Sequence, residues 1–457
     1  MKSRLANFWE KLSSSLWFVP TVMTVFAFAL AIGSVEIDTI FKEERGWTFG
    51  GGPAGAREVL SAIAASMITV AGVAFSITIV ALTLASQQFG PRLLRNFMRD
   101  RGNQVVLGAF IATFTYSLIV LRTIRSADGD FVPHLSVTMA IAFALASLGV
   151  LIYFIHHAAV TIQAPEVISR VATELNEGVD RLFPEALGRP PKEDEDEINP
   201  QLIKQFEREA KPALCRTTGY LQSIDNDRLM ALASENDLVF LLPCRPGDFL
   251  IEGSDLIQIK SSAQIEEHRI DEQMTVKINK CFIFGDQRTQ IQDIEFTVGQ
   301  LVEVAVRALS PAFNDPITAM SCIDRLTAAL CRLAERSMPS ACRYDDHDQL
   351  RIIVARPARF GEIVDGAFDS IRQYGRSSAP VTERLLEAIA LIAKRVKREK
   401  DRTALLNQAV MIERGSHEGL PEECDRQEVQ ERFRKAVLAL QERSWREPLG
   451  RSAIRQV

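Results

Sequence analysis

The sequence has 457 residues, of which 47% are hydrophobic and 24% charged, and its formal net charge is -5 at pH 7. This acidic balance, without a basic stripe interleaved with aromatic residues, argues against nucleic acid as a partner. The averages hide two halves, because residues 1–160 are mostly apolar whereas residues 162–457 are strongly charged. Such a division is typical of a membrane domain followed by a soluble domain.

Four long apolar runs fall in the first half of the chain. They are Leu16–Val35, Val59–Ala85, Val105–Leu121 and Leu135–Ile155. None contains a charged residue, and each is about long enough to cross a hydrocarbon core of roughly 30 Å as a helix. We therefore predict four transmembrane helices in a domain at residues 1–162. Without an ionisable residue in a span, an ion-coupled transporter is disfavoured.

The short connecting segments predict the orientation in the inner membrane. The first arm is basic, and so is the loop between the second and third runs; together they carry Lys2, Arg4, Lys11, Arg92, Arg95, Arg99 and Arg101. Basic segments of this kind stay in the cytoplasm, so we expect both termini there. All seven cysteines lie in the second half without a CxxC pair, which agrees with a reducing compartment.

The second run is longer than a span requires, and one face of it is small and mildly polar. Steps of three and four along a helix place on this face Ser66, Thr69, Gly72, Ser76, Val80, Thr83 and Gln87. The face suits close packing between membrane helices. It also suits the lining of a pore in a homo-oligomer, with Val80 as an apolar constriction. The sequence leaves both interpretations open.

A short basic segment follows this run. Gly90 and Pro91 break the helix, and Arg92, Arg95 and Arg99 then recur at helical spacing among apolar residues. We predict a short amphipathic helix on the cytoplasmic membrane surface. Its arginines suit binding to anionic lipid, and the alternative is that they focus anions at a pore mouth.

The second half is expected to be a cytoplasmic α+β region. We predict a membrane-exit helix with an acidic linker at 163–212, a small β-rich barrel or sandwich at 213–288, and a mainly helical domain at 289–457. The stretch "TVKINKCFIFG" is expected to close the sheet as a strand. A further strand is predicted from Leu350.

The stretch "RALSPAFNDPITAM" joins two predicted helices of the last domain. Asp315 suits the N-cap of the second helix, and Pro316 suits its first position. The remaining polar and turn-forming candidates are Arg307, Ser310, Pro311 and Asn314. The stretch is either a self-contained turn or an exposed helix start available to an anion or a subunit.

No nucleophile, zinc or phosphate-loop motif is recognisable in the chain. We therefore expect no cofactor, no metal site and no enzymatic activity.

Four stretches carry a resemblance to a known family. They are "FSITIVALTLASQQFGPRLL", "TGYLQSID", "LSPAFNDPITA" and "FDSIRQYG". With them the chain, from about residue 10 to 415, resembles a family of predicted bacterial integral membrane proteins catalogued only as a domain of unknown function. It departs from the expected motif at Ala312, where a glycine would stand. The resemblance implies the topology and carries no chemistry.

Our leading hypothesis is a homo-oligomeric, ion channel-like protein in the lipid bilayer. Its second span would line the pore, and its cytoplasmic domain would assemble or gate it. The alternative is a membrane-anchored sensor or scaffold whose cytoplasmic domain binds a partner.

Overall fold

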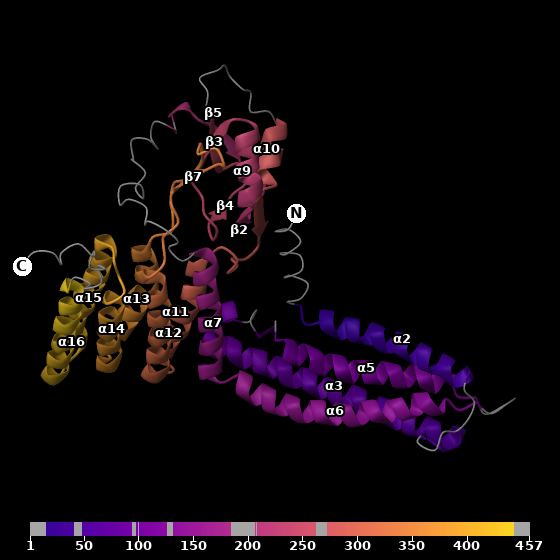
Figure 1. The fold of residues 1–457 in the computed structure, drawn as a ribbon. Coiled ribbons are helices and arrows are strands. Elements are labelled where there is room, and N and C mark those ends of the chain that lie inside the picture. The colour runs from indigo at the N-terminus through magenta and orange to yellow at the C-terminus, as the bar shows by residue number, and fades with distance from the viewer. Residues whose placement is uncertain are drawn as a thin grey trace, which may run out of the picture. The chain divides into compact units, whose positions relative to one another are not determined.

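The computed structural model describes residues 15–40, 48–93, 97–98, 100–125, 131–183, 206, 208–261 and 272–442. The chain divides into two compact units, Met1–Val167 and Ile168–Val457. Figure 1 shows long helices in the first unit and mixed sheet and helix in the second. The predicted fold class, a helical membrane domain followed by an α+β region, is confirmed.

Four helices of the described part are long and apolar enough to cross a membrane. They are α2 (Phe18–Ile40), α3 (Pro53–Phe89), α5 (Arg101–Thr123) and α6 (His134–Thr161). Helices α3, α5 and α6 each contain one predicted run, and α2 contains all of its run except Leu16 and Trp17. Helix α3 extends furthest beyond its run because polar but helix-compatible residues flank it. Its 37 residues make a helix about 55 Å long.

Helix α5 is the centre of the first unit. It packs against α2, α3 and α6, and half of its span is buried, against less than a quarter of each other span. Tyr116 and Val120 anchor one apolar cluster of the bundle. Phe110 anchors the other, where it meets Ala74 of α3 and Phe154 of α6.

Helix α2 continues past its predicted run and carries a buried carboxylate. Asp38 accepts hydrogen bonds from the backbone N–H groups of Leu135 and Ser136, both at 2.9 Å, and from the Ser136 hydroxyl at 2.6 Å. It thereby caps the first turn of α6, whose N–H groups have no partner within the helix. The expectation that no span carries a buried acid is therefore wrong, because the helix outlasts the apolar run.

The amphipathic helix α7 (Ala164–Leu182) crosses the division between the two units after Val167. Its apolar face is buried, and Asp180 on its other side pairs with Arg332 and Arg336, each at 2.6 Å. A helix was predicted here. Most of the predicted linker that follows lies outside the described residues.

Two sheets make up the β-rich region. The first has the order β1-β5-β3-β8-β7, with strands β1 (Lys211–Leu214), β3 (Leu238–Leu242), β5 (Asp255–Ser261), β7 (Cys342–Tyr344) and β8 (Leu350–Val354). The second has the order β4-β2-β6, with strands β2 (Gly219–Ile224), β4 (Phe249–Leu250) and β6 (Phe282–Gly285). Both sheets contribute side chains to one apolar core that includes Leu221, Phe240 and Ile257.

Two features of this region differ from the sequence reading. Of the predicted strand at 275–285, residues 275–279 belong to helix α10 (Glu272–Asn279), while Phe282–Gly285 form strand β6 in the second sheet as expected. Strand β8 pairs with β3 in parallel, so that Phe240 lies beside Ile352. The sheet therefore takes two strands, β7 and β8, from beyond the predicted module at 213–288. A further helix, α9 (Asn226–Glu235), packs on β3.

The remaining elements are helices. They are α11 (Ile294–Ala308), α12 (Pro316–Ala334), α13 (Phe360–Gly375), α14 (Ala379–Ala393), α15 (Glu399–Gly419) and α16 (Glu423–Gln441). Each has an apolar face at helical spacing that is buried against its neighbours. Figure 1 shows them side by side.

Candidate functional site

The seven predicted pore-lining residues all lie exposed on one side of α3. They are Ser66, Thr69, Gly72, Ser76, Val80, Thr83 and Gln87, and we call them the α3 stripe. At Gly72 an added Cβ would meet no atom within 4 Å. No described span of the same chain covers the stripe.

The side of α3 that packs within the chain is a different one. Its buried residues are Ala56, Leu60, Ala64, Ala71, Ala74, Thr78, Ala85 and Phe89. At 100° per residue, the mean direction of these residues lies roughly 180° from that of the α3 stripe. Small alanines thus bring α3 against α5, and the stripe does not serve packing inside the chain.

The hydroxyls of the stripe fall into two groups. Thr69 and Thr83 donate to the carbonyl oxygens four residues earlier, at 2.8 and 2.9 Å. The hydroxyls of Ser66 and Ser76 make no hydrogen bond within the described part of the chain. A hydroxyl without a partner is unfavourable in hydrocarbon, so these two sites favour contact with water or with another polar surface.

The basic segment after α3 is described only in part. Gly90 ends the helix at a φ of 105°, and η1 (Pro91–Leu93) follows. Arg92 is exposed, while Leu93 and Phe97 are buried. Arg95 and Arg99 lie outside the described residues.

The stretch between α11 and α12 forms a turn that satisfies its own polar groups. Asp315 caps α12 by accepting from Thr318 N at 3.0 Å and from the Thr318 hydroxyl at 2.6 Å, and Pro316 is the first helical residue. These hydrogen bonds lower the pKa of Asp315 below its usual value. Asn314 adopts a φ of 47° that the turn requires. Arg307 pairs with Glu303, and Ser310 donates to the Arg307 carbonyl.

Pro311 belongs to the exposed tip of the same turn. Phe313 and Ile317 beside it are 50% and 71% exposed. The polar residues of the turn therefore have partners within the turn and its flanking helices, and no ligand is needed to account for them. Two large apolar side chains remain exposed to solvent.

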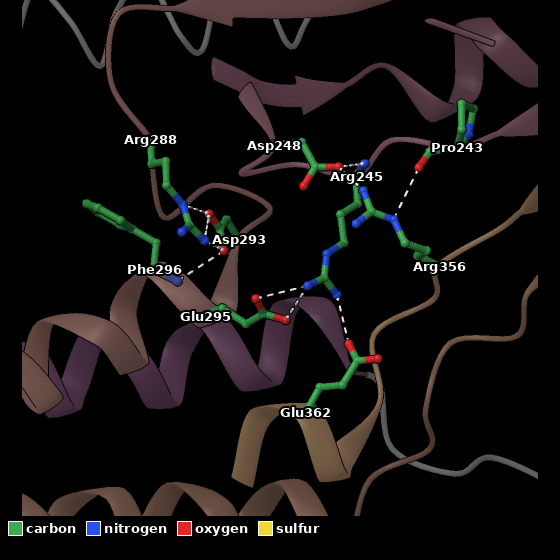
Figure 2. A network of polar contacts seen from close by, with 9 residues as sticks. All are labelled: Pro243, Arg245, Asp248, Arg288, Asp293, Glu295, Phe296, Arg356 and Glu362. Atoms are coloured by element: carbon green, nitrogen blue, oxygen red, sulfur yellow. Dashed lines mark hydrogen bonds and ion pairs between the residues drawn. The ribbon is translucent and has the colours of Figure 1, made fainter. Parts of the chain in front are cut away.

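A network of charges joins the β-rich region to the helices of the second unit (Figure 2). Arg245, in the turn between β3 and β4, contacts Glu295 of α11 at 3.0 Å and Glu362 of α13 at 3.1 Å. Its backbone N–H donates to Asp248, which also pairs with Arg356. One guanidinium thus links three elements that are far apart in the sequence.

A second pair lies beside this network. Arg288 donates to both carboxylate oxygens of Asp293, at 2.7 and 2.9 Å, and Asp293 caps α11 by accepting from Phe296 N at 3.0 Å. Burial raises the pKa of Asp293 and of Glu295, and the neighbouring arginines oppose the rise. Arg288 and Arg245 therefore favour the ionised form of these two carboxylates.

Sequence reasoning did not foresee this network or the Asp38 cap. Glu295 and Glu362 lie in the first turns of their helices, a position that favours acids, and this was the available signal. No local pattern indicates that one arginine would reach both. His157 of α6 contacts Asp100, the N-cap of α5, at 2.9 Å.

Comparison with known proteins bears on the whole chain. The family described as "Predicted membrane protein (DUF2254)" matches residues 13–391. The chain belongs to this family. An uncharacterized protein of Mycobacterium tuberculosis (strain ATCC 25618 / H37Rv) is similar to it, with 32% identity over 433 residues that cover 93% of this chain and 81% of the relative.

An uncharacterized protein of Mycobacterium bovis gives the same identity and coverage. No solved structure matches the chain. The predicted family resemblance is thus confirmed, and the four candidate spans agree with the family's description as a membrane protein.

Proposed function

We propose that this protein is a homo-oligomeric, ion channel-like protein in which copies of α3 face a common axis through the α3 stripe. The observation that carries the proposal is the position of the stripe, opposite the face of α3 that packs in the chain. A mildly polar, exposed face that takes no part in helix packing within its own chain favours a second copy as its neighbour.

The chemistry of the stripe supports a wet path. The hydroxyls of Ser66 and Ser76 have no partner among the described residues, and water or a neighbouring subunit would satisfy them. Val80 is the one large apolar side chain of the stripe and is 56% exposed. In a ring of α3 helices it would form a hydrophobic constriction.

We further propose an inner-membrane location with both termini in the cytoplasm. The basic segment around Arg92 would then lie at the cytoplasmic surface, near anionic lipid, as the excess of arginine there favours. The second unit would assemble or gate the pore, and we assign it no catalytic activity.

Planar-bilayer recording of the purified, reconstituted protein tests the proposal. Val80→Ser is expected to raise the conductance, because it removes the apolar constriction. Ile68→Ser is the matched control: Ile68 is also exposed on α3 and lies about 120° around the helix from Val80. Silence under voltage and tension, or equal effects of the two variants, would rule out a pore along this stripe.

One observation favours a second function, a membrane-anchored sensor or scaffold. Phe313 and Ile317 expose large apolar surface at a turn whose polar groups are already satisfied. If the second unit binds a partner there, Ser76→Ala leaves the cellular function intact and Phe313→Ser abolishes it. The channel proposal expects the reverse.

A further inference from the structure

An arginine-lined cavity of about 290 Å³ opens between α13 and α15. Arg372 lines it from α13, Arg376 from the C-cap of that helix, and Arg414 from α15. Glu418 is the one acid among its lining residues. The lining therefore carries a formal charge of +3 - 1 = +2.

The three arginines have unused donors. Arg372 gives one nitrogen to Asp369 at 3.0 Å, while its Nε is buried and has no hydrogen-bond partner. Arg414 is exposed and makes no hydrogen bond or ion pair within the part of the chain that the structure describes. Arg376 approaches Glu418 only to 3.9 Å. Arg372 and Arg376 thus each have an acidic partner, whereas Arg414 brings a positive charge to the cavity without one among the described residues.

Glycines on α15 keep the cavity open beside Arg376. Gly415 lines it, and an added Cβ there would only touch Arg376 Cβ at 4.0 Å. One turn later, Gly419 lets α15 come against the Arg376 carbonyl, which a Cβ would overlap. The close approach of the two helices and the absence of a side chain at 415 set the depth of the site.

We propose that this cavity binds a phosphate-bearing anion. Guanidinium groups match the geometry of phosphate oxygens and bind them through two parallel hydrogen bonds. Arg414, which is exposed and makes no hydrogen bond or ion pair within the described residues, can offer such a pair to a phosphate in the cavity. The volume lies near the lower end for ligand pockets, about 300–1,000 Å³, which suits one or two phosphate groups.

The proposal is independent of any pore along α3. Isothermal titration calorimetry of the full-length protein in neutral detergent, with inorganic pyrophosphate as the probe, tests it. Arg414→Gln is expected to weaken binding about tenfold, as removal of one charge-assisted hydrogen bond does. Arg434→Gln, another exposed arginine without a partner in the described residues, is the matched control and leaves the affinity unchanged.

A variant that is expected to bind more tightly distinguishes the loss of a ligand contact from misfolding of the site. Glu418→Gln removes the opposing charge and is expected to tighten pyrophosphate binding, which a misfolded site would not do. Absence of binding by the wild-type protein, or equal losses in Arg414→Gln and Arg434→Gln, would overturn the proposal.

A second experiment distinguishes a lipid headgroup from a soluble phosphate compound. Pyrophosphate affinity is compared in nanodiscs of phosphatidylcholine and in nanodiscs that also contain phosphatidic acid. A lower affinity with phosphatidic acid, which Glu418→Gln makes more pronounced, assigns the site to a lipid headgroup. An unchanged affinity assigns it to a soluble phosphate compound.

Discussion

Gly247 lies so close to Asp293 that a Cβ built on the glycine would overlap an oxygen of that carboxylate. The glycine also adopts a φ of 99°, in the turn that carries Arg245. Two independent reasons, backbone conformation and space, thus favour glycine where the β-rich region meets α11.

The two reasons can be separated by a pair of variants. Gly253 has a φ of 87° but open space around its Cβ position. Gly253→Ala is therefore expected to lower the free energy of unfolding by about 1–2 kcal/mol, the strain of a positive φ on alanine. Gly247→Ala is expected to cost about 1–3 kcal/mol more, since it also displaces the Arg288–Asp293 pair. Thermal unfolding of the two purified variants measures the difference. Equal losses of stability would show that the Arg288–Asp293 pair can move aside without cost.

The Arg245 network predicts a measurable coupling across the second unit. Arg245→Met leaves Glu295, which is two-thirds buried, without its partner. A double-mutant cycle with Glu295→Gln is expected to give a coupling of about 1–3 kcal/mol.

The control cycle uses Arg395 and Glu335, an ion pair whose side chains are 57% and 47% exposed. For such an exposed pair we expect a coupling of about 0–1 kcal/mol. If the two cycles agree within error, Arg245 is not a link between the sheet and the helices.

Acid stability should depend on Asp345. Hydrogen bonds from Arg351 and from the backbone of Gln349 lower the pKa of this carboxyl from 3.8 to about 2. The ionised carboxyl therefore stabilises the fold at any pH above its pKa in the unfolded chain. This stabilisation is lost as the pH falls from about 4 towards 2. Asp345→Asn is expected to be less stable at pH 7 and to show a flatter dependence of unfolding on pH in that window.

The neighbour Asp346, which is exposed and makes no ion pair in the described chain, provides the control. Unfolding midpoints between pH 7 and 2 are compared for wild type, Asp345→Asn and Asp346→Asn. A pH profile of Asp345→Asn that is as steep as that of the wild type contradicts the assignment.

Replacing the N-cap residue of α12 is expected to lower stability by the amount usual for a helix cap. Asp315→Ala removes both hydrogen bonds to Thr318 and is expected to lower stability by about 1 kcal/mol. Asp315→Asn retains an acceptor and should lose less. Should cellular function vanish in Asp315→Asn while its unfolding midpoint stays near the wild-type value, Asp315 has a role beyond the cap.

Periodicity predicted much of the first unit but not its packing order. The steps from Ser66 to Gln87 defined one side of α3, and the structure finds that side exposed. The sequence did not show that α5 would be the central helix, because apolar residues surround every span and mark no preferred face. Asp38 was missed for a similar reason, since its partner Ser136 lies almost a hundred residues away.

In the second unit, the sequence predicted local elements but not the pairing of strands that are far apart in the chain. The strand predicted from Leu350 is found as β8 (Leu350–Val354). The pairing of β3 with β8 joins segments more than a hundred residues apart, which no local signal reports. Residues 275–279 were misread because Val276 and Ile278 alternate as in a strand. Met274 and Ile278, one helical turn apart, are the residues that pack on the core.

The central place of α5 has a consequence for how the chain assembles in a bilayer. Helices α2 and α3 emerge first, yet their described residues make little contact with each other, and each packs mainly on α5. After the first two segments have inserted, neither has its main neighbour until the third is synthesised. Stable association of the bundle thus begins with the third segment. Tyr116 lies in the apolar cluster that joins α5 to both earlier helices, whereas Phe110 packs with residues of α3 and α6.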